Sequence, residues 1–238
     1  MTTRDAFLGG RLHLHQPRAG FRAGSDAILL AASVPARGGD DILDLGCGVG
    51  AVMYAVATRV PDLRLTGVEV DADTVSLAAR NGDAQVIHSS IFDLPVALRT
   101  RQFAHVATNP PYFRAADGSP SASAKREQGL REDQPGGLTR WVQVACKRVA
   151  PKGTCSVIVR ADRLADVLAP MAVALGRLRV LPIAARPGDD AKRVIVQGTQ
   201  GARGPLRLLS PFVLHDADGG YLPGADSVLR NAAALPLT

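Results

Sequence analysis

The residues best able to do chemistry in this sequence lie where apolar strands are expected to end. Asp44 opens the segment Asp44-Leu-Gly-Cys-Gly-Val-Gly50 at the end of a short apolar stretch. Asn109 opens Asn109-Pro-Pro-Tyr112 after another such stretch. Because parallel strands place their carboxyl ends along one edge of a sheet, where ligands bind, we expect the two segments to face one ligand.

The glycine-rich segment predicts a cofactor-binding turn made by Gly46, Gly48 and Gly50. The spacing of Gly46, Gly48 and Ala51 also satisfies the dinucleotide fingerprint. Asp44 argues against a dinucleotide, because a carboxylate about 4 Å from a phosphate would cost about 4 kcal/mol at an effective dielectric near 20. S-adenosylmethionine carries an ammonium and a sulfonium and no phosphate, so the segment favours that cofactor. NAD(P) or another nucleotide, and a purely structural turn, are the alternatives.

Two further acidic residues follow the next two expected strands. Glu69 ends the second strand and can bind ribose hydroxyls. Asp93 follows the third strand, where it can accept a hydrogen bond from an adenine amino group, with Phe92 against the ring. The alternative for Asp93 is a surface aspartate that caps a turn.

The segment around Asn109 is suited to an amine substrate. An amino group conjugated to a ring is a poor nucleophile, and two acceptors aimed at its hydrogens free its lone pair. The Asn109 side-chain oxygen and the Pro110 carbonyl can be those acceptors, while Tyr112 can stack on a planar substrate. We also expect Asn109 to bind the cofactor, through a weaker contact. We expect catalytic roles for Asn109, Pro110 and Tyr112 and substrate contacts for Pro111, Tyr112 and Phe113. A proline pair that merely ends a strand is the alternative.

Strands alternate with helices along most of the chain, which predicts a doubly wound, mostly parallel α/β sheet. Strands are expected over 42–45, 63–70, 84–88, 103–108, 154–159, 180–184, 193–198 and 206–214. Helices are expected over 49–60, 72–80, 138–149, 163–175 and 227–234. We therefore assign residues 41–238 to one domain, interrupted by a long polar loop at 114–137. Residues 1–40 are an N-terminal extension packed on it, with a strand at 11–15 and a helix at 27–34 capped by Ser25.

The motifs together resemble a known class of enzymes. Asp44-Leu-Gly-Cys-Gly-Val-Gly50, Gly67-Val-Glu69 and Asn109-Pro-Pro-Tyr112, in this order, are similar to the class I S-adenosylmethionine-dependent amino-methyltransferases. The N-terminal Gln16-Pro17-x-x-Gly20-Phe21-Arg22-x-Gly24-x-Asp26 and the C-terminal Phe212-Val-Leu-His-Asp-x-Asp-Gly-Gly-Tyr221 resemble the bacterial tRNA(Val) adenine-N6 methyltransferases.

This resemblance implies a seven-stranded, Rossmann-like sheet whose last strand is antiparallel, with Val194–Gly198 in one of the last two strands. It implies methylation of adenine N6 in tRNA, and it implies that Asp26 reaches or covers the cofactor. The alternative for Asp26 is a first-turn aspartate that the helix dipole favours. Because related enzymes share the Asn-Pro-Pro-Tyr motif, protein glutamine-N5 and ribosomal RNA guanine-N2 methylation stay as alternatives. A non-catalytic module that binds nucleotide or RNA is a third.

The charge distribution favours a polyanionic partner. The chain has a net charge of +6, and 24 of its 28 basic residues are arginine, whose planar fork suits phosphate. Residues 114–152 hold eight bases against four acids. We expect Arg126 and Arg131 in the polar loop to contact RNA phosphates; ordinary solvated arginines are the alternative.

Composition argues against other classes of protein. The longest apolar run, residues 27–34, is far shorter than the roughly 20 residues that span a bilayer, and the first residues lack the apolar core of a signal peptide. The three cysteines form no C-x-x-C pair, so we expect neither a disulfide framework nor a bound metal. These features predict a cytoplasmic protein whose oligomeric state the sequence leaves open.

Overall fold

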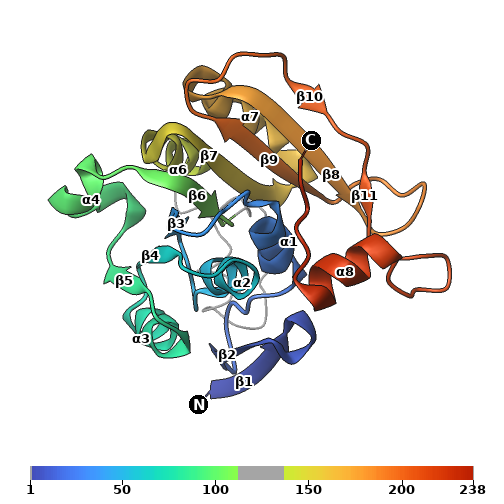
Figure 1. Cartoon of the computed structure of the whole chain (residues 1–238), viewed down its shortest axis with the longest axis horizontal. Helices are drawn as coiled ribbons and strands as arrows, with labels where there is room; N and C mark the ends of the chain where they lie inside the picture. The colour runs from blue at the N-terminus through green and yellow to red at the C-terminus, as the bar shows by residue number, and fades with distance from the viewer. Residues whose placement is uncertain (1, 112–136, 238) are drawn as a thin grey trace.

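The computed structural model describes residues 2–111 and 137–237, which form a central sheet with helices on both faces (Figure 1). The long strands are β3 (Asp41–Leu45), β4 (Arg64–Glu69), β5 (Gln85–His88), β6 (Phe103–Thr108), β7 (Val149–Arg160), β8 (Gly176–Ala184) and β9 (Arg193–Thr199). The helices are α1 (Ser25–Ser33), α2 (Ala51–Arg59), α3 (Ala72–Asn81), α4 (Val96–Thr100), α6 (Gly137–Lys147), α7 (Leu164–Ala174) and α8 (Pro223–Asn231), with short 3₁₀ turns η1 (Leu8–Gly10), η2 (Ile91–Asp93) and η3 (Ala161–Arg163).

The sheet has the expected doubly wound topology. Its long strands lie in the order β5-β4-β3-β6-β7-β9-β8, and only β9 runs antiparallel to its neighbours. The predicted strand at Val194–Gly198 is therefore the antiparallel one. The expected count of seven strands is wrong for the described residues, because β10 (Arg207–Leu208) and β11 (Phe212–Val213) also pair with β8 and bring the sheet to nine. These two-residue pairings replace the single strand expected over 206–214.

Alternating side chains along the strands build two separate hydrophobic layers. Along β9, Ile195 packs with α1, α2 and α8, whereas Val194 and Val196 pack with α6 and α7 on the opposite face. Ile42 and Leu43 of β3 divide in the same way. This two-residue period is what a strand covered by helices on both faces requires. No helix in the described parts of the chain is long and apolar enough to cross a bilayer.

The N-terminal residues form an antiparallel hairpin of β1 (Thr2–Phe7) and β2 (Leu12–Pro17) beside the main sheet (Figure 1). Arg22 ties the segment before α1 to this hairpin, since its guanidinium donates to Asp5, to the Thr3 hydroxyl and to the Pro17 carbonyl. The residue before α1 is Gly24, so Ser25 is not the cap that the sequence predicted. The boundary between extension and domain at residue 40 stays a prediction.

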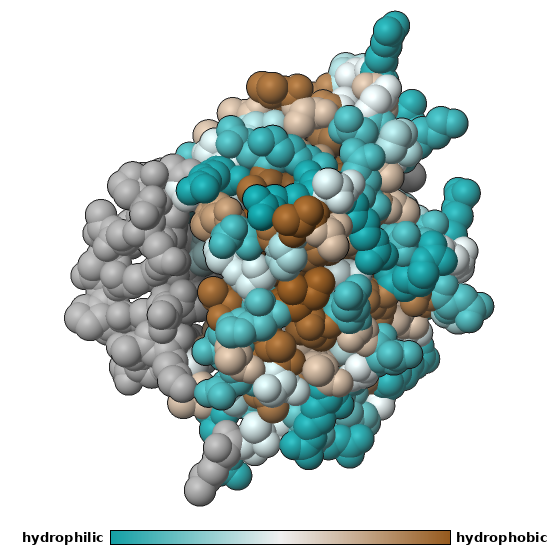
Figure 2. Space-filling view, turned by 90° about the vertical axis from the view of Figure 1, so that its left-hand side faces the viewer, coloured by the Kyte–Doolittle hydropathy of each residue, from teal (hydrophilic) through white to brown (hydrophobic). Residues whose placement is uncertain are grey.

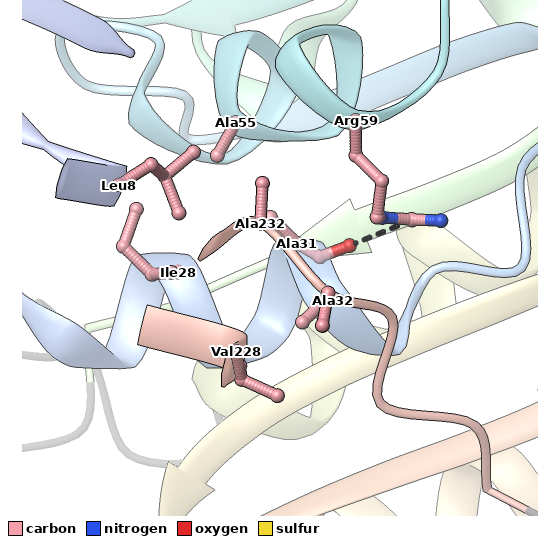
Figure 3. A pocket seen from close by; sticks show the side chains of 9 residues that line it. Leu8, Ile28, Ala31, Ala32, Ala55, Arg59, Val228 and Ala232 are labelled. Carbon is pink, nitrogen blue, oxygen red and sulfur yellow. Dashed lines mark hydrogen bonds between the residues drawn. The ribbon is translucent and has the colours of Figure 1, made fainter. Parts of the chain in front are cut away.

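A small pocket lies between α1, α2 and α8 (Figure 3). Its lining is apolar except for Arg59, whose guanidinium donates to the backbone carbonyls of Ala31 and Val34. With its cation already bonded to the chain, the pocket has no free polar group to orient a ligand. We interpret this pocket as a packing defect between α1, α2 and α8.

Candidate functional site

Three of the predicted site residues, Asp44, Glu69 and Asn109, lie where β3, β4 and β6 end, which we call the carboxyl edge. The three strands are parallel, and their register places Asp44 level with Gly67 of β4 and Ala107 of β6. Glu69 and Asn109 therefore stand two residues further along, at the level where the glycine turn begins. The parallel pairing thus gathers three polar residues that are far apart in the sequence.

The turn from Gly46 to Gly50 leaves β3 and starts α2. Gly46, Gly48 and Gly50 all have positive φ, at 70°, 54° and 85°, a conformation that side chains disfavour. The Gly48 amide donates to Glu69 Oε2 over 3.0 Å, so the tip of the turn is attached to β4. A Cβ at Gly48 would meet nothing within 4 Å, which means that this backbone borders open space.

Asp44 is a buried acid with one unused oxygen. Its Oδ2 accepts a hydrogen bond from the Met53 amide at 3.3 Å, whereas Oδ1 is buried and has no hydrogen-bond partner within the described part of the chain. Burial, together with the charge of Glu69 and against the Met53 hydrogen bond, raises the pKa of Asp44 to about 7. Such a carboxylate is poised to receive a cationic group, because a positive charge would offset its desolvation.

Glu69 is held rigidly at the end of β4. Its Oε1 accepts from the amides of Val70 and Asp71 at 2.8 and 3.0 Å, and its Oε2 accepts from Gly48. A carboxylate has about four acceptor positions, so one is left for a ligand hydroxyl. Val70, which follows it, is exposed although apolar. The ribose contact of Glu69 stays a prediction.

An aromatic pair borders the site on the side of η2. Phe92 is 39% exposed and meets Trp141 of α6 edge to face, with ring centroids 6.1 Å apart. The Arg140 guanidinium lies 4.7 Å from the Phe92 ring centroid. The Asp93 side chain is exposed beside this pair. No local pattern in the sequence indicates a role for Trp141, since it follows the glycine turn by almost a hundred residues.

Asn109 and Pro110 directly follow β6, with Pro110 buried and Pro111 half-buried. Asn109 Oδ1 is buried and has no hydrogen-bond partner among the residues that the structure describes. Buried acceptors without partners are rare in proteins, so this oxygen and Asp44 Oδ1 point to groups that a ligand supplies. Two unpartnered acceptors, an open glycine turn and a nearby aromatic surface fit S-adenosylmethionine and an amine substrate.

The remaining predicted residues divide into two groups. Asp26 lies in the first turn of α1, where its carboxylate pairs with Arg193 of β9 at 2.8 Å, so its expected cofactor contact stays a prediction. Others fall outside the described residues: Tyr112, Phe113, Arg126 and Arg131, with nearly all of the polar loop.

The glycine turn gives a matched pair of substitutions. A Cβ at Gly46 would lie 2.6 Å from the Trp141 ring. We therefore expect Gly46→Ala to destabilise the fold by about 2 kcal/mol or more, as overpacking of a protein core does. Gly48→Ala adds a methyl group in open space and should cost only about 1 kcal/mol of backbone strain. Urea denaturation compares the two. Equal losses of stability would contradict the close approach of Trp141 to Gly46.

Comparison with known proteins agrees with this geometry. Residues 20–126 match the family described as Methyltransferase small domain. A crystal structure of a predicted O-methyltransferase from Agrobacterium tumefaciens superposes with a TM-score of 0.73 at 26% identity, covering 89% of this chain and 98% of that one. An RNA guanine methyltransferase from T. thermophilus, solved with AdoMet and guanosine, shares the fold at 19% identity and a TM-score of 0.56, over 84% of this chain and half of its own.

The protein is therefore a methyltransferase with the class I fold, and its methyl donor is S-adenosylmethionine. This confirms the predicted class and cofactor. Two proteins of this class that are similar to this chain over nearly its full length are named tRNA1(Val) (adenine(37)-N6)-methyltransferase. The protein from Aeromonas hydrophila is 28% identical, covering 93% of this chain and 94% of its own. The protein from Porphyromonas gingivalis is 25% identical, covering 92% of this chain and 91% of its own.

Proposed function

We propose that the protein transfers a methyl group to the N6 amine of an adenine in tRNA. The observation that carries the proposal is that Oδ1 of Asn109 and Oδ1 of Asp44, at the same edge, are both buried and find no hydrogen-bond partner in the described ranges 2–111 and 137–237. One acceptor suits the hydrogens of an amine, and the other suits the cationic part of the methyl donor. The named function of the full-length relatives supports this pairing.

Asp44, Glu69 and the glycine turn would hold S-adenosylmethionine, with Phe92 beside its adenine. Bound there, the cofactor supplies a methyl group on a sulfonium, which is already a strong leaving group. The chain therefore needs no strong base. The Asp44 carboxylate is buried, so its attraction for a cation is larger than it would be in water.

Asn109 and Pro110 would orient the substrate amine. Asn109 Oδ1 and the Pro110 carbonyl accept its two hydrogens, which turns the nitrogen lone pair toward the methyl group. The proline ring fixes φ near −65°, so the carbonyl is preorganised. Rate then comes mainly from positioning and fixed dipoles. We expect Tyr112 to stack on the adenine.

The substrate is tested by incubating the protein with methyl-labelled cofactor and separate pools of tRNA, ribosomal RNA, DNA and protein. We expect label in tRNA, as N6-methyladenine after digestion, and we expect the enzyme to work in the cytoplasm. Label in protein glutamine, or in guanine of ribosomal RNA, would replace this proposal with one of the alternatives. No label in any pool, with the cofactor bound, would favour a non-catalytic module.

We expect the affinity for tRNA to fall steeply with salt, because arginine side chains release counterions from phosphates. Neutralising Arg126 and Arg131 together, as glutamine, should weaken tRNA binding and flatten the salt dependence, while cofactor affinity stays unchanged. Filter binding at several salt concentrations measures both effects. The matched control is Arg4→Gln with Arg18→Gln, two exposed arginines of the N-terminal region. A wild-type affinity that does not change with salt would contradict a phosphate contact.

A further inference from the structure

The side chain of Trp141 contacts three parts of the candidate site. Its indole Nε1 donates to Thr108 Oγ1 over 2.8 Å, its ring covers Gly46, and its edge-to-face contact supports Phe92. These groups come from β6, from the turn after β3 and from η2. Trp141 is also the only tryptophan in the chain.

Two hydrogen bonds join α6 to both strand ends that carry the unpartnered oxygens. Thr108 Oγ1 has one hydrogen, which it donates to the Leu45 carbonyl over 2.7 Å, and it accepts the Trp141 N–H on a lone pair. Thr108 is fully buried and precedes Asn109, while Leu45 lies between Asp44 and Gly46. The path from Trp141 through Thr108 to Leu45 therefore fixes β6 against β3 beside both groups.

We propose that Trp141 is a positioning residue that sets the place of Asn109 relative to the cofactor side of the site. Trp141 acts through the Thr108 hydroxyl, and neither Trp141 nor Thr108 touches the reacting atoms. This inference rests on the proposed amine methylation. Because transfer depends on alignment, a small displacement of Asn109 should lower turnover more than it lowers cofactor affinity.

The first test uses the emission of Trp141, which has no background from other tryptophans. Titration of the wild-type protein with S-adenosylmethionine should change the intensity or wavelength of this emission, with the same dissociation constant that calorimetry gives. Cofactor binding in calorimetry without any change in emission would overturn the placement of Trp141 beside the cofactor.

The second test separates the hydrogen bond from packing. Trp141→Phe keeps an aromatic ring without the N–H, and Thr108→Val keeps the shape without the hydroxyl. Each should lower single-turnover methyl transfer about tenfold, the size of one lost hydrogen bond, and calorimetric cofactor affinity should change less than about twofold. The double variant should be no slower than the slower single one, because both remove the same bond.

Two control variants keep the test decisive. Thr108→Ser retains the hydroxyl and should restore most of the rate. Ser33→Ala removes a buried hydroxyl that donates to Leu30 over 2.7 Å in α1, and it should reduce stability without reducing turnover. Losses that multiply in the double variant, or a Thr108→Ser as slow as Thr108→Val, would overturn the proposal. A wild-type protein that binds cofactor but methylates no tRNA would overturn the proposed substrate instead.

Discussion

Replacing Asn109 by alanine should lower methyl transfer by about 10²–10³-fold, the cost of one preorganised hydrogen-bonding group. The structure gives the reason, since Asn109 Oδ1 is buried and none of the described residues bonds to it, which leaves an acceptor for a ligand. Cofactor affinity should fall far less, because Asp44 and Glu69 stay in place. Single-turnover transfer to tRNA at saturating cofactor measures the chemical step, and calorimetry measures the affinity.

The charge variant tells more about the role of Asn109. Asn109→Asp keeps an acceptor of the same size, so it should retain more activity than alanine. Gln102→Ala is the control, because it deletes an exposed amide just before the other end of β6 and should leave the rate unchanged. If Asn109→Ala methylates at the wild-type rate, the Asn-Pro-Pro-Tyr segment only ends a strand.

The fold could be predicted because its signals are local and repeated. Each strand of the alternation carries apolar residues at neighbouring positions, and β6 has the predicted bounds 103–108. Polar residues that follow such strands gather at the carboxyl edge, since parallel strands all end on the same side of the sheet. The predicted closeness of Asp44, Glu69 and Asn109 depended on this rule alone, and the parallel register agrees with it.

The features that the sequence missed depend on contacts between distant segments. β1 reads Thr-Thr-Arg-Asp-Ala-Phe, which has no apolar alternation, and its strand conformation depends on its pairing with β2. Trp141 has the spacing of an ordinary amphipathic helix position, and nothing local shows that its indole reaches Thr108. The two edge pairings to β8 have only two residues each, too few to form a period.

Asp44→Asn should have opposite effects on binding and on stability. The cofactor brings positive charge to a buried carboxylate, and losing one partner of such a pair costs on the order of 3 kcal/mol, so affinity should fall more than about a hundredfold. In the wild-type protein, affinity should rise as pH increases through about 7, because the carboxyl must lose its proton to attract the cation. Calorimetry between pH 6 and pH 8 tests both, since the variant should lack this pH dependence.

Without cofactor, the same substitution should stabilise the fold above neutral pH. The folded-state pKa of Asp44, about 7, is higher than its unfolded value of 3.8, so the folded chain binds the extra proton between these values. The contribution of Asp44 to wild-type stability must then fall as pH rises from about 4 to 7 and stay reduced above 7. Asparagine carries no charge and keeps an acceptor for the Met53 amide, so the gain in unfolding free energy of Asp44→Asn over wild type should grow over the same interval to about 2 kcal/mol.

Urea denaturation at pH 5 and pH 8 measures this gain, with Asp93→Asn as the exposed control. An Asp44→Asn protein less stable than wild type at pH 8 would mean that the buried charge is compensated within the chain, and Asp44 would then be a structural acid.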